Sequence, residues 1–512
     1  MNTERKDSMT SEHLDVLIVR AGLSGIGTAY YLQTRCPQKR YAILEGRKAI
    51  GGTWDLFRYP GVRSDSDMYT LGYSFRPWQD KQAIADGSLI LRYIRETAAE
   101  FGIDRQIRFD HRVRCATWSS AEALWTVEAV CGPEQEIARF TCNFLCMCTG
   151  YYDYAQGYTP EWPGLEQFAG RIVHPQQWPE NLDYAGKQIV VIGSGATAVT
   201  LAPALAEQAT HTTILQRSPT YIVARPSEDA IAERLYKVLP GKLAYHFVRW
   251  RSILLGIYFY SLMRRRPEAA KQAIIRMAQK QLGPDYDVST HFTPVYNPWD
   301  QRLCLAPDGD LFKAITSGKV SMVTDQIETF TERGIRLRSG KDLAADIIIT
   351  ATGLNMKLMS GVQLVVDGVL VDLAKALSYK GMMYSDIPNL ASAFGYTNAS
   401  WTLKSELIAQ YICRLLNYMD RHGYAQCTPR QQDHLLAEGP VVPLTSGYVQ
   451  RAVHTLPRQG SRKPWKMYQN YVRDLVSFRF NSVDDGTMEF TPRAKSELRQ
   501  AGEATAYVQS ER

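Results

Sequence analysis

The stretch DVLIVRAGLSGIG, residues 15–27, starts as an apolar β run and continues through small residues into a helical pattern. A second β run, YAILE, ends at Glu45, roughly 20 residues after the last glycine. Strand, glycine turn, helix, strand and acid in this order are typical of a dinucleotide-binding unit, in which the helix N-terminus faces the pyrophosphate and the acid binds the ribose. We therefore expect Gly22, Gly25 and Glu45 to bind a dinucleotide.

A second unit of the same kind, KQIVVIGSGATAVTLAPALAEQ, starts at residue 187. Its turn residues are Gly193, Gly195, Thr197 and Ala198, with G-x-G-x-x-A spacing. After its next β run, Arg217 and Ser218 stand in place of the ribose-binding acid. An arginine pairs with a 2′-phosphate that an acid would repel, so this site is predicted to take NADPH. Two units in one chain then indicate FAD at the first site. Because no close-spaced cysteine pair lies near either turn, we expect the electrons to pass to oxygen or to an organic substrate.

Arg20 stands where the first unit should have its first glycine. A Cβ at this turn brings strain on the order of 1–3 kcal/mol. At about 1.4 kcal/mol per tenfold change in affinity, this predicts a roughly five- to hundredfold weaker FAD site. Three interpretations stay open: a weakened working enzyme, a flavin-poor inactive homologue, and an introduced substitution. An arginine that turns outward and pairs with a phosphate would recover part of the loss.

The composition is that of an ordinary globular protein of 512 residues with a formal net charge of +7. The sequence has no basic arm, RNA-binding motif or zinc-finger spacing, so we expect no nucleic acid partner. The first residues are polar, which predicts no secretory signal, and nine scattered cysteines are typical of reduced thiols in the cytoplasm. Cys142, Cys146 and Cys148 lie in one apolar run and are interpreted as buried strand residues, so we expect no metal.

The most apolar stretch is SILLGIYFYSLM, residues 252–263, which is shorter than the ~20 residues that span a bilayer. Arg249 and Arg251 precede it, and three arginines follow at 264–266. Two interpretations stay open. One is a basic-flanked helix that lies on a membrane surface; the other is a helix buried between domains, with solvated arginines at its ends.

The stretch FAGRIVHPQQWP, residues 168–179, connects the two units. Its pattern F-x-G-x-x-x-H-x-x-x-W-P resembles the signature of type I Baeyer–Villiger monooxygenases, which are class B flavin monooxygenases. The matching residues are Phe168, Gly170, His174, Trp178 and Pro179. The stretches GGTWDLFRYPGVRSDSDMYTLGYSFRPW, YNPWDQRLCLAPDGDLF, DIIITATGLN and GYTNASWTLK resemble the ethionamide-activating subgroup of this family. The resemblance covers nearly the whole chain.

The motifs and the resemblance together predict an α/β fold with two Rossmann-like dinucleotide-binding domains, for FAD and NADP, and a helical insertion. The expected FAD-binding parts are residues 1–148 and 355–512. The expected NADP-binding parts are residues 149–226 and 298–354, and the expected helical insertion is 227–297.

The resemblance implies that NADPH reduces FAD and that a C4a-peroxyflavin formed with O2 converts ketones to esters or lactones. Sulfides or thioamides can be S-oxygenated instead. It also implies that Arg302 is the fixed cation of the reaction, a role that suits a guanidinium because it stays charged. Asp65 would orient Arg302 and assist hydride transfer. The alternative for Asp65 is a turn or helix cap in SDSD.

Two further stretches are expected at the flavin by resemblance. Gly52, Thr53 and Trp54 would approach its ring and pyrophosphate, and GYTNASW, residues 395–401, would close over it. The nearest alternative function is an N- or S-oxygenating flavin monooxygenase, which the pair Trp178–Pro179 disfavours. The other is a nucleotide-binding protein disabled by Arg20.

Overall fold

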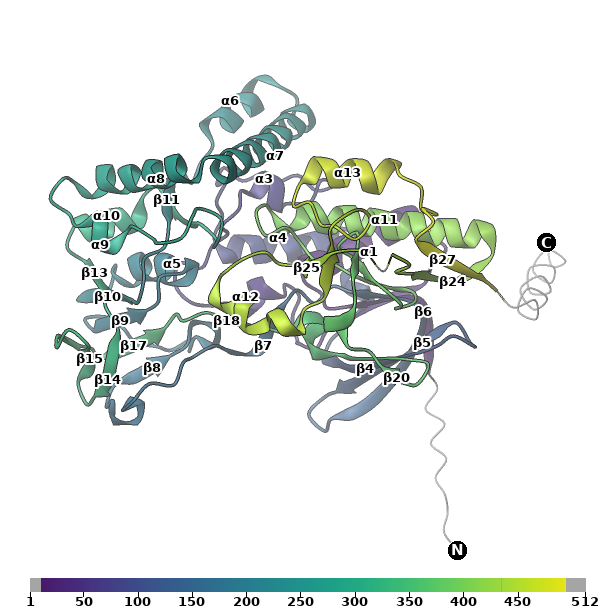
Figure 1. Ribbon diagram of the computed structural model, residues 1–512, viewed down its shortest axis with the longest axis horizontal. Helices are drawn as coiled ribbons and strands as arrows, with labels where there is room; N and C mark the ends of the chain where they lie inside the picture. Colours follow the sequence, from purple (N-terminus) through teal and green to yellow (C-terminus); the bar gives the residue numbers. More distant parts are fainter. Residues whose placement is uncertain (1–10, 434, 494–512) are drawn as a thin grey trace, which may run out of the picture.

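The computed structural model describes residues 11–433 and 435–493. Figure 1 shows two lobes side by side. The first is built around a mixed sheet with antiparallel pairs at β4–β5–β6, and the second around a parallel sheet, and helices pack on both. The predicted α/β class with two Rossmann-like units is confirmed. Strands from residues 12–147 and from residues 363–392 share the first sheet, so the chain leaves this lobe and later returns to it.

The first sheet is built on β1, whose residues 16–19 are all apolar and buried, as expected for a parallel strand covered on both faces. The sheet runs in the order β20 (Val369–Leu370), β19 (Gln363–Val366), β4 (His111–Ser119), β5 (Leu124–Cys131), β6 (Glu136–Met147), β1 (Glu12–Val19), β2 (Tyr41–Leu44) and β3 (Ile107–Arg108), and β23 (Leu390–Ser392) also pairs with β6. Cys142 and Cys146 lie in β6 and Cys148 follows it, all three buried.

Helices and short strands complete the first lobe. The helices are α1 (Leu23–Arg35), α2 (Thr53–Leu56), α3 (Met68–Leu71), α4 (Gly87–Glu100), α11 (Trp401–His422), α12 (Gly447–Ala452) and α13 (Tyr471–Phe480). The strands are β21 (Ser378–Tyr379), β22 (Met383–Tyr384), β24 (Tyr424–Pro429), β25 (Glu438–Pro440), β26 (Arg458–Gly460) and β27 (Met488–Pro492). The long helix α11 is largely buried and packs on α1, so the C-terminal part of the chain covers the first glycine turn.

The second sheet is wholly parallel, and α5 (Ala196–Leu205) joins two of its neighbouring strands. Its order is β13 (Val320–Thr324), β10 (His211–Gln216), β9 (Gln188–Ile192), β17 (Ile347–Thr350) and β8 (Arg171–Val173). Beside it lie β11 (Ile222–Arg225), β12 (Cys304–Pro307), α10 (Asp310–Thr316) and the antiparallel strands β14 (Ile327–Thr331), β15 (Gly334–Leu337) and β16 (Asp342–Ala344). The two chain crossings between the lobes, β7 (Tyr152–Gly157) and β18 (Leu354–Met356), pair with each other.

A helical excursion rises from the second lobe and passes over the first along the upper edge of Figure 1. It contains α6 (Ala230–Val238), α7 (Gly241–Arg265), α8 (Pro267–Leu282) and α9 (Val288–His291). Among the described residues, no helix is both long and apolar enough to cross a membrane.

The helix α7 is anchored by a buried charge. The guanidinium of Arg249 donates to Glu406 of α11 at 2.8 Å and to the carbonyl oxygens of Tyr69 and Gly72. The opposite face, which includes Leu254, is exposed. The expectation of a helix buried between domains is therefore wrong for that face.

The buried pair Arg249–Glu406 predicts a stability effect. Glu406→Gln leaves a buried guanidinium without its carboxylate and should lower the free energy of unfolding, measured by urea denaturation, by about 3–5 kcal/mol. The control Glu233→Gln removes a carboxylate from an exposed pair with Lys237 and should cost less than about 1 kcal/mol. Equal losses in the two variants would contradict the anchoring role.

Candidate nucleotide-binding and catalytic site

The first glycine turn is shaped for a close approach to a ligand. No described side chain caps the N-terminus of α1. The first N–H groups of this helix are therefore not used by a capping side chain and point toward the turn. A Cβ on Gly25 would clash with the carbonyl oxygen of Arg20, and one on Gly52 would lie 3.1 Å from the Cα of Gly22. Gly52 also has a φ of +57°, which favours glycine. These residues fit the pyrophosphate of a dinucleotide.

Glu45 lies at the carboxyl end of β2, buried, where an adenosine ribose would be bound. Its carboxylate accepts backbone N–H groups from Ala21 at 2.8 Å and Arg47 at 2.9 Å. The guanidinium of Arg20 also donates to it, at 3.0 Å. The side chain of Arg20 therefore does not turn outward toward a phosphate; it folds back over the carboxylate, and its φ of +86° is a strained value for a residue with a Cβ. The residues fit FAD with this one departure, because the ribose hydroxyls and Arg20 would share one acceptor.

The second glycine turn repeats the geometry of the first. The helix α5 begins after Gly195 without a cap from any described side chain, and Gly193 lies against the carbonyl of Ala351 so closely that a Cβ would clash. Thr197 lies in the first turn and Ala198 is buried beneath it. Arg217 and Ser218 follow β10 directly and are exposed. A guanidinium free to meet solvent at this edge fits a 2′-phosphate, as predicted for NADPH.

The loop between α2 and α3 runs from the first turn to the second. A Cβ on Gly61 would lie 2.9 Å from Ala204 of α5, so the loop packs against the second lobe. In this loop Asp65 accepts a hydrogen bond from the guanidinium of Arg302 at 2.9 Å, across 237 residues of sequence. The helix cap of α3 is Asp67, which accepts from the N–H of Thr70, so the capping alternative belongs to Asp67 and not to Asp65.

Arg302 lies among aromatic side chains that the sequence motifs did not mark. Its pKa is lowered by burial but raised more by Asp65 and by Tyr151, so the net pKa lies above the ordinary value. The phenol of Tyr151 is also close to Tyr152 and packs on Trp401, with ring centroids 5.4 Å apart. The three tyrosines at 151, 152 and 448 follow no spacing rule, since chain segments far apart bring them together. Arg302 thus keeps a permanent charge in a partly apolar environment.

The segment 395–401 reaches the first glycine turn, where we expect it to close over the flavin. The indole N–H of Trp401 donates to the hydroxyl of Ser24, in the first turn of α1, at 2.8 Å. Phe394, Trp401 and Tyr448 line a small cavity with Tyr151. On the other side of the turn, Thr53 and Tyr154 share a hydrogen bond of 3.1 Å, and Trp54 packs against the core.

The stretch 168–179 contacts the segment in which the chain crosses back between the lobes. One ring nitrogen of His174 contacts the carbonyl oxygen of Gly353 at 3.2 Å, and the other accepts the N–H of Gln176. Burial lowers the pKa of His174, so the neutral ring is favoured. The remaining motif residues pack locally: Phe168 is buried under the second sheet, Gly170 faces a carbonyl too closely for a Cβ, Trp178 contacts Tyr184, and Pro179 begins the turn that follows. His174 thus ties the motif to the second crossing.

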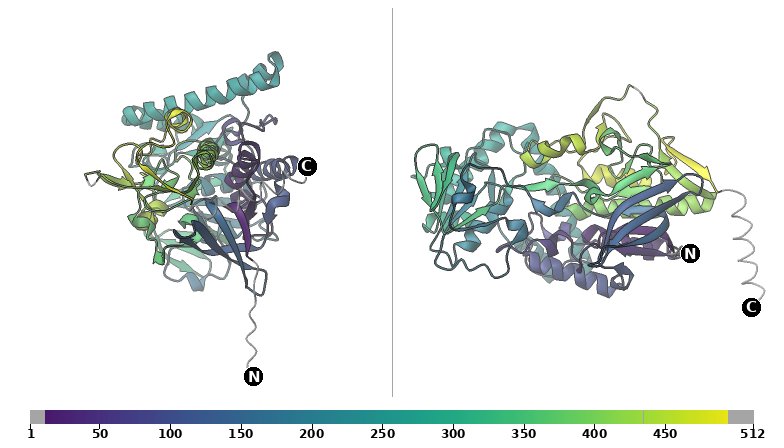
Figure 2. Two further views of the ribbon diagram at one scale, coloured as in Figure 1. Left: turned by 90° about the vertical axis from the view of Figure 1, so that its right-hand side faces the viewer. Right: turned by 90° about the horizontal axis from the view of Figure 1, so that it is seen from below.

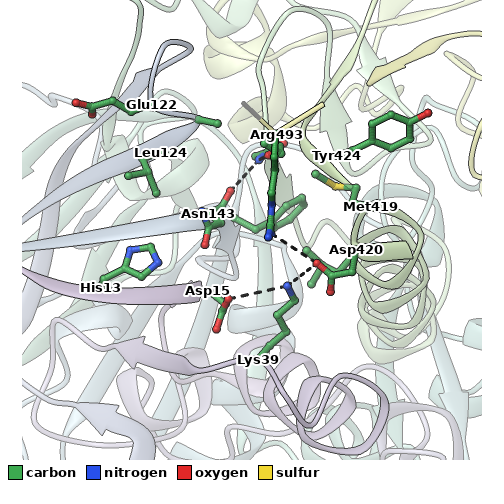
Figure 3. Close-up of a pocket in the computed structure, with 15 residues that line it drawn as sticks. His13, Asp15, Lys39, Glu122, Leu124, Asn143, Met419, Asp420, Tyr424 and Arg493 are labelled. Carbon is green, nitrogen blue, oxygen red and sulfur yellow. Dashed lines mark hydrogen bonds and ion pairs between the residues drawn. The ribbon is translucent and has the colours of Figure 1, made fainter. Parts of the chain in front are cut away.

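A polar cavity of about 370 Å³ lies elsewhere, at the amino end of β1 (Figure 3). Figure 3 shows His13, Asp15, Lys39, Asp420 and Arg493 around it. Lys39 pairs with Asp420 at 2.8 Å and approaches Asp15 at 3.9 Å. Since β1 runs from this cavity toward Arg20, the cavity is at the opposite edge of the sheet from the glycine turn and does not belong to the site.

The chain is similar to known flavin-dependent monooxygenases. A family model described as flavin-binding monooxygenase-like matches residues 71–382. The FAD-containing monooxygenase EthA of Mycobacterium tuberculosis (strain H37Rv) is 55% identical over 484 residues, 94% of this chain and 99% of that protein. The probable FAD-binding monooxygenase AlmA of Acinetobacter baylyi is 48% identical over 481 residues, covering 94% and 96%.

Solved structures share the fold at low sequence identity. A steroid monooxygenase bound to NADP has a TM-score of 0.74 and 21% identity, covering 94% of this chain and 100% of that one. An OTEMO complex with FAD and NADP has a TM-score of 0.67 and 22% identity, covering 82% and 88%.

The contact between Arg20 and Glu45 predicts loose flavin binding. Arg20→Gly removes both the strain and the competing guanidinium, so the FAD dissociation constant should fall by about five- to hundredfold. The ratio of flavin to protein absorbance and the thermal midpoint of the purified protein should both rise. Arg20→Ala keeps a Cβ at the strained turn and should give an intermediate gain. A wild-type chain already fully loaded with FAD, and no more stable after either change, would show that Arg20 is tolerated.

The position of Arg217 predicts cofactor preference. Arg217→Ala removes the guanidinium that we expect to pair with the 2′-phosphate, and it should raise the KM for NADPH by about tenfold or more, since a charge-assisted pair is lost. The KM for NADH should change little. Steady-state kinetics with both nucleotides make the comparison, and an equal rise for both would remove the 2′-phosphate role.

Proposed function

The chain belongs to the flavin-binding monooxygenase-like family, and from this we propose that it catalyses the NADPH- and O2-dependent conversion of ketones to esters or lactones. It is a flavoprotein monooxygenase that uses FAD and NADP cofactors. Sulfides and thioamides are a second proposed substrate class, because their sulfur atom can accept the oxygen. When bound, FAD supplies the hydride acceptance and the oxygen activation that no side chain can provide.

The observation that carries the proposal is the ion pair between Arg302 and Asp65. Negative charge develops on oxygen during the transfer of an oxygen atom to a carbonyl, and a fixed cation stabilises it. The carboxylate of Asp65 holds one nitrogen of the Arg302 guanidinium at 2.9 Å. Because a guanidinium has five N–H donors, the others stay available for the substrate and the nicotinamide.

The aromatic residues around Arg302 have a separate proposed role. Tyr151, Phe394 and Trp401 pack on one another at centroid distances of 5.4–5.7 Å between the guanidinium and the first glycine turn. We infer that these rings exclude water from the reacting atoms, which strengthens every electrostatic interaction there.

The alternatives differ in what they require of the site. An N- or S-oxygenating flavin monooxygenase would share both glycine turns, but Trp178 and Pro179 favour the Baeyer–Villiger type. A flavin-poor homologue would follow if the contact between Arg20 and Glu45 prevented FAD binding. We propose a cytoplasmic enzyme, because all nine cysteines are free thiols.

The proposed role of Arg302 predicts the loss of oxygen transfer without loss of flavin. Arg302→Ala should lower the rate of ester formation by about 100- to 1000-fold, the usual effect of removing a preorganised electrostatic donor. The absorbance of bound FAD should stay unchanged. The matched control is Arg336→Ala, which removes an arginine from an exposed pair with Asp342, also 2.9 Å long. Normal turnover by the Arg302 variant would overturn the proposal.

A further inference from the structure

The helix α7 has its charged anchor inside and its apolar side chains outside. Its inner face buries Tyr245, Val248 and Arg249 against the first lobe. The outer face carries Leu243, Trp250 and other large apolar side chains at spacings of three and four residues, so they form one stripe. A helix on the surface of a water-soluble protein normally shows the reverse order.

The exposed apolar surface continues onto α6 and is large. It comprises eleven of the nineteen exposed large apolar side chains in the described part of the chain: Ile231, Val238, Leu239, Leu243, Phe247, Trp250, Leu254, Leu255, Tyr258, Phe259 and Leu262. Figure 2, in its left view, shows the long helix along one outer edge of the molecule. We call these eleven side chains the α6–α7 face. An apolar surface of this extent on one edge marks an interaction site.

The charges around the α6–α7 face indicate the kind of partner that it binds. Residues 241–265 contain no Asp or Glu, and α6 carries one, Glu233, which pairs with Lys237. Lys242 lies near the start of α7, and at its end Arg265 and Arg266 follow Arg264, which pairs with Asp300. Arg265 continues the stripe of Leu254 and Tyr258 by helical spacing. A flat apolar face with aromatic residues and basic ends complements an anionic lipid surface, where the apolar side chains insert and the bases meet the headgroups. We propose that the protein binds peripherally to anionic bilayers through the α6–α7 face.

The same helix contacts two segments that reach the candidate site. Ile253 packs with Tyr396 and Leu403 under the segment that reaches the first glycine turn. At its other end, Met263 accepts the indole N–H of Trp299, and Arg264 pairs with Asp300 at 2.6 Å. Trp299 and Asp300 lie within three residues of Arg302 in the chain. A membrane-bound α7 next to the site favours lipophilic substrates that partition into the bilayer. This inference about substrates rests on the proposed oxygenation.

Vesicle flotation of the full-length holoprotein tests the proposal. At low salt the protein should float with phosphatidylcholine vesicles that contain phosphatidylglycerol, and several-fold less at high salt, because salt screens the basic residues. Phe247→Ser with Leu254→Ser removes two inserted side chains and should weaken binding by about tenfold or more. The matched control, Val369→Ser with Leu370→Ser on β20, removes similarly exposed apolar side chains elsewhere and should float like the wild type.

A second pair of variants tests the charge. Arg265→Glu with Arg266→Glu should reduce flotation with anionic vesicles while leaving the thermal midpoint of the protein unchanged. Flotation does not depend on turnover, so a failure of the proposed reaction would leave this result standing. The proposal is overturned if the wild type stays unbound at low salt. It is also overturned if the Phe247 and Leu254 variant only converts a dimer to a monomer in sedimentation, since the face would then bind a second copy of the chain.

Discussion

The ion pair between Arg302 and Asp65 is the contact on which the candidate site depends. Its partners come from segments 237 residues apart, and both are placed by packing between the lobes. Gly61 sets the loop of Asp65 against α5, and the contacts of α7 hold the loop that leads to Arg302. His174 and the pairing of β7 with β18 fix the two chain crossings and thereby the relative position of the two sheets. Any change in the relative position of the lobes therefore changes the site.

Much of this organisation could be predicted from local patterns. Each glycine turn lies between a buried strand and a helix, so strand, turn and helix identify the two units without knowledge of distant residues. The fold class follows from that order and is confirmed. Residue roles at Arg302 and Asp65 stay predictions, although the structure brings the two side chains together.

Other features could not be predicted because they depend on the tertiary fold. Tyr151 and Tyr448 meet at Arg302 only after the C-terminal part of the chain returns to the first lobe. The direction of the Arg20 side chain depends on a buried carboxylate at 3.0 Å, and the sequence left an outward orientation open. The outer face of α7 was ambiguous for a related reason, since an apolar stretch with arginines at its ends has the same composition whether it is covered or exposed. Arg20 departs from the glycine pattern of the turn, and α7 departs from the usual order of a surface helix. Such departures from local rules are expected at functional sites.

The proposed reaction transfers one atom of O2 to a carbonyl compound at this site. Its most direct measurement is mass spectrometry of the product formed from a ketone, NADPH and ¹⁸O2 by the FAD-loaded protein in ordinary water. The proposed reaction predicts an ester or lactone that carries one ¹⁸O atom from the gas. Consumption of NADPH without such a product, or an ester whose new oxygen comes from water, would contradict it.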